Sequence, residues 1–203
     1  MTDCRKRSTP MEIGYKPHAI QAEQQPVDAR TYQKATGSIL YAALSTRPDV
    51  TYRTSVLGRY AAQPPTLHWE AVKHLLRYLR GTSAYKLTIH DPSLGHDSQS
   101  ILCYADADLG GEADTSKSTS GIVIYALGTL VIWKSKKQSV VAQSTMQAEM
   151  IAIEYGKVQN HSLRDLTSEI GIASKHITRR ILNDGLNCIT TLNSGNFLSD
   201  SQH

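Results

Sequence analysis

The apolar positions of the chain follow a helical repeat up to about residue 85 and an alternating repeat beyond it. The clearest helix is predicted over residues 66–82, with Thr66 as its cap and Gly81 as a left-handed end. Its apolar side chains recur at intervals of three and four residues: Trp69, Val72, Leu75, Leu76 and Leu79. Basic residues fall largely on its other side, which is typical of a solvated helix face: Lys73, Arg77 and Arg80.

Two further helices are predicted before this one. Residues 31–50 follow a helical pattern that should end at Arg47-Pro48, because the residue before a proline disfavours helical geometry. Asp49 is then suited to cap a second helix, over about 50–61. Residues 1–30 are polar, contain proline and show little periodicity, which predicts an irregular or extended lead-in.

After residue 85 the chain alternates between apolar and polar residues, which predicts strands. These strands are expected over residues 85–90, 100–108, 121–127, 130–136 and 179–184. A tight hairpin across Gly128-Thr129 should join the third and fourth of them. The segment 186–192 fits either a helix or a strand.

Two helices are expected between the last two strands, over about 144–158 and 161–171. Ser144 or Thr145 can cap the first of them, and Gly171 can end the second. Strands and helices in this order predict an α/β domain with a mixed sheet.

The composition narrows the class of protein. A chain of 203 residues allows one full domain, or one domain and part of another. No apolar run approaches the roughly 18 residues of a membrane span, and no apolar region follows the basic N-terminus, so we expect neither a membrane segment nor a secretory signal. Three distant cysteines, Cys4, Cys103 and Cys188, indicate no disulfide framework, and an intracellular location is expected, with cytoplasm and nucleus both open.

Charge is divided unevenly along the chain. Residues 1–90 carry a net charge of +7 and residues 91–203 a net charge of −3. A basic half joined to an acidic half suits a polyanion-binding part beside a cation-binding part. Uneven surface charge without a partner is the alternative.

Three acidic residues stand where elements of the α/β pattern begin or end. Asp106 lies at the exit of a strand, Glu149 one turn into a helix, and Asp184 at the end of the last strand. If such carboxylates converge at one sheet edge, they repel one another unless a cation neutralises them, and Mg²⁺ prefers such oxygen ligands. Two Mg²⁺ ions about 4 Å apart can hydrolyse a phosphodiester. The spacing alone favours the ordinary interpretation, solvated acids at element ends.

Longer segments resemble a known family. They are "YQKATGSILYAALSTRPDVTYRTSVLGRYAAQPPTLHWEAVKHLLRYLRGT" (32–82), "YADADLGGEADTSKSTSGIVIYALGTLVIWKSKKQSVVAQSTMQAEMIA" (104–152) and "ILNDGLNCI" (181–189). In this order they resemble the C-terminal region of the copia/Ty-type LTR-retrotransposon Pol polyprotein, which joins the end of the reverse transcriptase to a ribonuclease H domain.

The resemblance implies a fold and a domain order. The expected fold is α/β, a ribonuclease H-like mixed sheet of five strands with flanking helices. Residues 98–203 would form this domain, truncated at its C-terminus. Residues 31–90 would be a small helical connection segment from the reverse transcriptase, after a lead-in of residues 1–30.

The resemblance also implies a site. Asp106, Glu149 and Asp184 would be the catalytic and metal-binding acids, holding two Mg²⁺ ions for cleavage of the RNA strand of an RNA–DNA hybrid. Asp108 would only accompany Asp106, and Glu112 would be loop decoration, as would Asp114. The upstream reverse transcriptase part of a polyprotein is the other expected partner.

Lysines of the segment "WKSKKQ" are candidates for contact with nucleic-acid phosphates: Lys134, Lys136 and Lys137. Such contacts fix the position of a nucleic acid without reading its sequence. Equally, lysines on an exposed hairpin edge discourage pairing with other strands.

Several positions depart from the family pattern. Leu109 stands in place of a tryptophan, Gln147 in place of an acid, Met150 in place of a tyrosine and Gly185 in place of an asparagine. The fourth acid expected near the C-terminus has no match in context. Two functions therefore stay open, an active ribonuclease H and a catalytically decayed fragment that at most binds nucleic acid.

Overall fold

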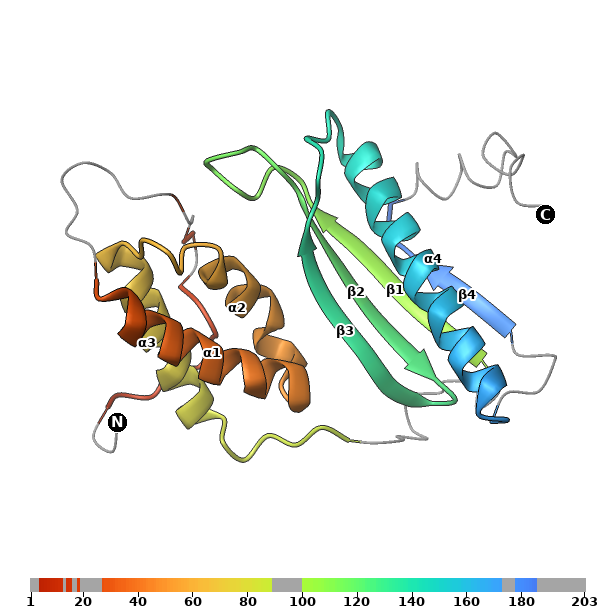
Figure 1. Ribbon diagram of the computed structural model, residues 1–203, viewed down its shortest axis with the longest axis horizontal. Helices are drawn as coiled ribbons and strands as arrows, with labels where there is room; N and C mark the ends of the chain where they lie inside the picture. Colours follow the sequence, from red (N-terminus) through yellow and green to blue (C-terminus); the bar gives the residue numbers. More distant parts are fainter. Residues whose placement is uncertain are drawn as a thin grey trace. The chain divides into compact units, whose positions relative to one another are not determined.

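The computed structural model describes residues 4–12, 14–15, 18, 27–88, 100–172 and 178–185. The chain divides into two compact units, Met1–Thr88 with Glu112–Thr115, and Ile89–Gly111 with Ser116–His203. Helices make up the described part of the first unit, and a sheet with one long helix makes up that of the second (Figure 1). The predicted domain boundaries at residues 30 and 98 stay predictions.

Helix α1, Ala29–Ser45, opens the helical part of the first unit. The Asp28 carboxylate caps it, accepting a hydrogen bond from the Thr31 backbone N–H at 2.9 Å. The helix ends just before Arg47-Pro48, as predicted, and a short 3-10 turn, η1, Pro48–Val50, leads into α2, Thr51–Gly58, and then α3, Thr66–Gly81. Fully buried side chains from these helices form the core: Tyr32, Ile39, Leu57, Val72 and Leu75.

Three predicted helix caps of this unit are wrong, those at Asp49, Thr66 and Gly81. No side chain caps α2, because the Asp49 carboxylate is bonded to Arg47 and Tyr78 instead. The N-cap of α3 is Pro65, and Gly81 lies inside the helix without a left-handed conformation. Gly81 serves packing, since a Cβ there would stand 2.8 Å from the Arg7 carbonyl oxygen.

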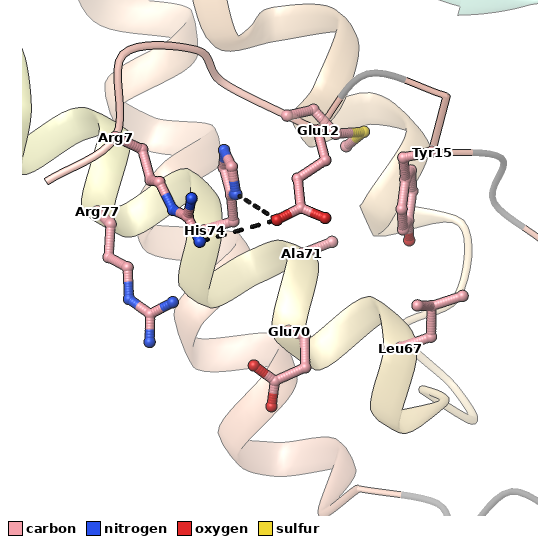
Figure 2. Close-up of a pocket in the computed structure, with 9 residues that line it drawn as sticks. Arg7, Glu12, Tyr15, Leu67, Glu70, Ala71, His74 and Arg77 are labelled. Carbon is pink, nitrogen blue, oxygen red and sulfur yellow. Dashed lines mark ion pairs between the residues drawn. The ribbon is translucent and has the colours of Figure 1, made fainter. Parts of the chain in front are cut away.

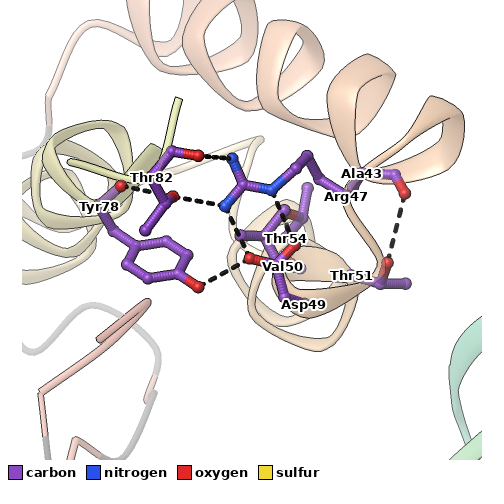
Figure 3. Close-up of polar contacts among 8 residues, drawn as sticks. All are labelled: Ala43, Arg47, Asp49, Val50, Thr51, Thr54, Tyr78 and Thr82. Atoms are coloured by element: carbon purple, nitrogen blue, oxygen red, sulfur yellow. Dashed lines mark hydrogen bonds and ion pairs between the residues drawn. The ribbon is translucent and has the colours of Figure 1, made fainter. Parts of the chain in front are cut away.

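Hydrogen bonds of Arg47 link the turn before α2 to the end of α3 (Figure 3). Its guanidinium donates to both carboxylate oxygens of Asp49, at 2.9 and 2.7 Å. It also donates to the carbonyl and hydroxyl oxygens of Thr82, at 3.3 and 2.6 Å, and the Tyr78 hydroxyl donates to Asp49 at 2.7 Å. Because this pair is bidentate and largely buried, hydrogen bonds satisfy its charges, and the polar turn η1 can pack against the hydrophobic core.

The described N-terminal residues 4–12 form no helix or strand, as predicted, yet they lie along α3. Arg80 donates to the Cys4 carbonyl oxygen at 3.1 Å, and His74 bonds the Thr9 carbonyl oxygen at 2.9 Å. The polar side chains of α3 at His74 and Arg80 therefore contact this segment.

The second unit contains a mixed sheet in the order β3-β2-β1-β4. Its strands are β1, Ser100–Asp108, β2, Thr119–Ala126, β3, Thr129–Lys137, and β4, Thr178–Leu182. β2 is antiparallel to β1 and β3, whereas β4 is parallel to β1. The hairpin turn falls on Leu127 and Gly128, one position earlier than predicted, and both have positive φ, as in the two-residue turns that match strand twist.

Helix α4, Thr145–Glu169, runs unbroken where two helices were predicted. Ser144 caps it, since its hydroxyl accepts from the Gln147 N–H at 3.1 Å. Nothing in the sequence near residue 160 breaks the helix, and the left-handed Gly171 comes only after its end. Residues 85–88 form no strand, which corrects the prediction for 85–90 as far as that segment is described.

The α4 helix packs on one face of the sheet (Figure 1). The contact is close at Gly156, where a Cβ would stand 2.8 Å from the Cys103 sulfur. Burial raises the pKa of Cys103 to about 11, so this side chain packs as an uncharged thiol. The core between helix and sheet consists of small and β-branched side chains: Ile101, Cys103, Ala105, Ile122, Ile124 and Ala152.

The described part of the chain limits two expectations. It holds four strands, so the predicted fifth strand is not seen there, and the segment 186–192 lies outside the described residues. No helix in the described ranges is long and apolar enough to cross a membrane.

Gly156→Ala should lower the free energy of unfolding of the second unit by about 1–3 kcal/mol, because the added methyl group overpacks the contact with Cys103. Gly37→Ala is the matched control, since a Cβ at Gly37 in α1 meets nothing within 4 Å. This control should gain about 0.5–1 kcal/mol from helix propensity. Urea denaturation followed by circular dichroism measures both, and equal stabilisation by the two substitutions would contradict the packing argument.

Asp49→Asn should lower the free energy of unfolding by about 2 kcal/mol, because it leaves the Arg47 charge largely buried without its partner. Burial raises the pKa of Asp49, but hydrogen bonds from Arg47 and Tyr78 outweigh it and leave that pKa lowered. The stabilisation is thus present above the carboxyl pKa of the unfolded chain and is lost as the pH falls through the lowered folded pKa.

The matched control for Asp49→Asn is Asp165→Asn, which breaks an exposed Arg164–Asp165 pair. Exposed pairs contribute about 0–1 kcal/mol, so this control should change the unfolding free energy little. Denaturation curves at pH 7 and in the acid range measure the two variants side by side, and equal losses would refute the role given to Asp49.

Candidate metal centre

Three carboxylates from three elements meet in the second unit. Asp106 lies on β1, Glu149 near the start of α4, and Asp184 just after β4. One carboxylate oxygen from each lies within 4.8 Å of the others. The two aspartates are exposed and Glu149 is half-buried, so the cluster opens to solvent. The structure thus brings together the three acids singled out from the sequence.

Strand register explains why the two aspartates lie level with each other. β1 and β4 are parallel, and Tyr104 pairs with Leu182 at the end of the ladder. Asp106 and Asp184 each follow two residues after that pair. Because parallel strands leave a sheet at the same edge, both side chains reach one place.

Gln138 connects the start of α4 to the sheet. This buried side chain donates from Nε2 to the Ser120 hydroxyl at 3.0 Å and to the Ala148 carbonyl oxygen at 2.9 Å. Its backbone N–H donates to the Ser118 carbonyl oxygen at 2.9 Å. The residue before Glu149 is thereby held to β2, which limits where the Glu149 side chain can start.

Asn183 contacts the cluster directly. Its amide nitrogen donates to Glu149 Oε2 at 2.7 Å and to the Ala105 carbonyl oxygen at 2.9 Å, and its Oδ1 accepts from the Gly185 N–H at 2.8 Å. Asn183 therefore orients Glu149 while spanning from β4 to β1. Sequence reasoning missed both Asn183 and Gln138, although an amide next to an expected ligand acid was a usable signal.

The cluster raises the pKa of Glu149. Burial is the largest cause, and the negative charges of Asp106 and Asp184 add to it. Hydrogen bonds from Asn183 and from the Ala107 N–H act in the opposite direction but do not cancel the rise. A cation bound at the cluster would therefore favour the ionised form of Glu149.

The neighbouring acids take other positions. Asp108 is outside the cluster formed by the described residues, and its carboxylate covers Gly111, where a Cβ would be only 2.1 Å from Oδ2. Glu112 is not the loop decoration that was predicted. It belongs to the first unit and is buried there, 3.5 Å from the Arg59 guanidinium, and Asp114 accepts a hydrogen bond from Tyr60 at 3.0 Å.

The three candidate lysines of β3 divide between the two faces of the sheet. Lys134 donates a hydrogen bond to Gln159 of α4, and the Lys136 ammonium lies 5.0 Å from the centre of the Tyr155 ring. Lys137 pairs with Thr119, which in turn pairs with Asp108. Because paired residues share a face, Lys137 is the lysine on the Asp108 side. Contact of these lysines with phosphates stays a prediction.

The fold and the cluster define a class of protein. The second unit is an α/β domain whose mixed sheet carries three carboxylates at the end of its parallel strand pair. No profile of a known protein family matches the chain. No solved structure matches it either.

Curated relatives place the chain in a family. It is 38% identical over 144 residues, 71% of its length, to the retrovirus-related Pol polyprotein from transposon TNT 1-94 of Nicotiana tabacum, of which it covers 10%. It is 31% identical over 87% of its length to the Pol polyprotein from transposon RE2 of Arabidopsis thaliana, of which it covers 12%. It is 37% identical to the secreted RxLR effector protein 161 of Plasmopara viticola, across 83% of that protein and 60% of this chain.

The chain is homologous to a segment of the retrovirus-related Pol polyproteins of transposons, and it belongs to one family with the effector protein, of which it covers 83%. It spans only about a tenth of the length of the polyproteins.

Asp184→Asn should lower the pKa of Glu149, because it removes one of the negative charges that raise it. A carboxyl group with a raised pKa stabilises the fold below its unfolded pKa, and this contribution is lost as the pH rises through the folded pKa. The variant should therefore lose less stability than the parent protein between acid and neutral pH. Carbon-detected NMR titration of the side-chain carboxyl groups in metal-free protein measures the pKa, with Asp165→Asn as an unchanged control.

Proposed function

We propose that the second unit is a ribonuclease H-type endonuclease domain that cleaves the RNA strand of an RNA–DNA hybrid with two Mg²⁺ ions. The observation that carries this proposal is the meeting of Asp106, Glu149 and Asp184, with carboxylate oxygens within 4.8 Å of one another. The same three residues match the catalytic acids of the family that the sequence resembles. Similarity to a segment of transposon Pol polyproteins supports the proposal.

The donor set of the cluster fits magnesium. All three groups offer hard carboxylate oxygens, and the exposed aspartates leave room for water ligands, which Mg²⁺ usually keeps. Burial, with a smaller contribution from the charges of Asp106 and Asp184, raises the pKa of Glu149, and a bound cation would favour the ionised carboxylate.

Each residue near the cluster has a distinct part in the proposed reaction. When bound, Mg²⁺ supplies Lewis-acid activation of water and neutralises charge on the phosphodiester. Asp106, Glu149 and Asp184 hold the ions, and Asn183 fixes Glu149 Oε2 through its 2.7 Å hydrogen bond. Lys137, which lies on the Asp108 face of the sheet, would contact a phosphate of the hybrid.

The alternative is a catalytically decayed module that at most binds nucleic acid. Departures from the family pattern at Leu109, Gln147 and Met150 favour this alternative, and the last two flank Glu149 on α4. The intact three-acid cluster favours the enzyme, because a decayed site has no reason to keep three repelling carboxylates together.

The full chain should cleave a labelled RNA–DNA hybrid in Mg²⁺ but not in EDTA. Asp106→Asn and Glu149→Gln should each slow cleavage by about a thousandfold, because several kcal/mol of charge stabilisation is lost with a metal ligand. Glu154→Gln on the exposed side of α4 is the matched control and should cleave at the parent rate. Cleavage no faster than that of Asp106→Asn would refute the enzyme, and retained hybrid binding would then support the decayed module.

Asn183→Ala should slow cleavage by about 10- to 100-fold, as substitutions of residues that orient metal ligands usually do. It should also raise the pKa of Glu149 further, because the hydrogen bond from Asn183 lowers that pKa. The pKa readout distinguishes loss of orientation from unfolding. An unchanged rate and an unchanged pKa would contradict the role given to Asn183.

A further inference from the structure

A pocket of about 140 Å³ lies in the first unit, between the N-terminal segment and α3 (Figure 2). It is separate from the acidic cluster and has no part in the function proposed above. Charged side chains of both signs line it, from the N-terminal segment Arg7 and Glu12, and from α3 Glu70, His74 and Arg77.

His74 presents a buried nitrogen without a hydrogen bond to this pocket. The residue is only 6% exposed. Its Nε2 lies 2.9 Å from the Thr9 carbonyl oxygen, so Nε2 carries a proton. Nδ1 makes no hydrogen bond to any described residue, and the nearest acid, Glu12 Oε1, is 3.5 Å away. Nδ1 can accept a hydrogen bond when the ring is neutral and donate one when it is protonated.

Two guanidinium groups stand on the same side of the pocket as His74 (Figure 2). Arg7 lies 3.8 Å from Glu12 Oε1. Arg77 lies three residues after His74 on α3 and makes no ion pair or hydrogen bond with the part of the chain that the structure describes. Glu70 does not neutralise Arg77, since it is paired with Lys73.

Glu12 is held loosely in this arrangement. Its side chain is 68% exposed, and both of its contacts run through one oxygen, at 3.5 Å to His74 and 3.8 Å to Arg7. Both distances exceed those of an ordinary hydrogen bond. The Glu12 carboxylate therefore contacts Arg7 and His74 only weakly, and it does not pair with Arg77.

We propose that this pocket binds a phosphate group, which displaces the Glu12 carboxylate. The oxygens of a tetrahedral phosphate can accept hydrogen bonds from Arg7, from Arg77 and from the protonated His74 ring, and arginine can pair with phosphate through two parallel hydrogen bonds. The volume of about 140 Å³ equals that of four to five water molecules at about 30 Å³ each, which suits a group of five heavy atoms. The phosphate can be a free ion or part of a nucleic acid.

Isothermal titration calorimetry of the full chain with inorganic phosphate, without divalent cations, tests this site independently of cleavage. Arg77→Gln should weaken binding about tenfold, because a charge-assisted hydrogen bond is lost. Glu12→Gln should tighten binding about threefold or more, because it removes the competing charge. Arg30→Gln, an exposed arginine on α1, is the matched control and should bind like the parent protein.

Opposite changes in affinity for Arg77→Gln and Glu12→Gln support the site, since misfolding of either variant would only weaken binding. Absence of phosphate binding by the parent protein overturns the proposal, and so does equal affinity of Arg77→Gln and Arg30→Gln. A short RNA–DNA hybrid titrated in the same way identifies the source of the phosphate. A loss with Arg77→Gln for both ligands indicates nucleic acid, and a loss for inorganic phosphate alone indicates the free ion.

Discussion

Electrostatic repulsion among three carboxylates is the constraint on which the second unit depends. Oxygens within 4.8 Å of one another cost free energy when all three groups are ionised, and the charges of Asp106 and Asp184 add to burial in raising the pKa of Glu149. Backbone pairing and the Asn183 amide hold them there, and no cationic side chain among the described residues pairs with them. Parallel pairing of β1 and β4 levels the two aspartates, and Asn183 bonds Glu149 across both strands.

The position of α4 is set by close packing and by one buried amide. Gly156 allows the helix to approach Cys103 of the sheet, and Gln138 bonds the carbonyl of Ala148, next to Glu149. The helix is continuous over 25 residues, so its packing in the middle and its attachment at the start act on the same rigid body. Substitutions at positions next to Glu149 therefore change individual side chains, while the helix that positions the Glu149 carboxylate stays in place.

In the first unit, a polar turn between helices packs against a small helical core, and its charged groups need buried partners. Arg47 and Asp49 do this by bonding one another, Tyr78 and Thr82 within a largely buried network. The same unit leaves Arg77 and a nitrogen of His74 facing a pocket. The stretch "TRPDV" (46–50), which lies in the segment that resembles the transposon family, thus has a structural role, whereas the pocket was not visible in any sequence pattern.

The sequence by itself determined the element types, most of their positions and the identity of the three acids. β1 begins and ends where the alternation placed it, and α1 stops before Arg47-Pro48, because both depend on local backbone preferences. Only the tertiary structure decided that Asp49 bonds Arg47 and Gly81 serves packing instead of capping, and which amides support the acids. Those outcomes depend on contacts between residues distant in the chain, such as Ala105 with Asn183, about which local periodicity carries no information.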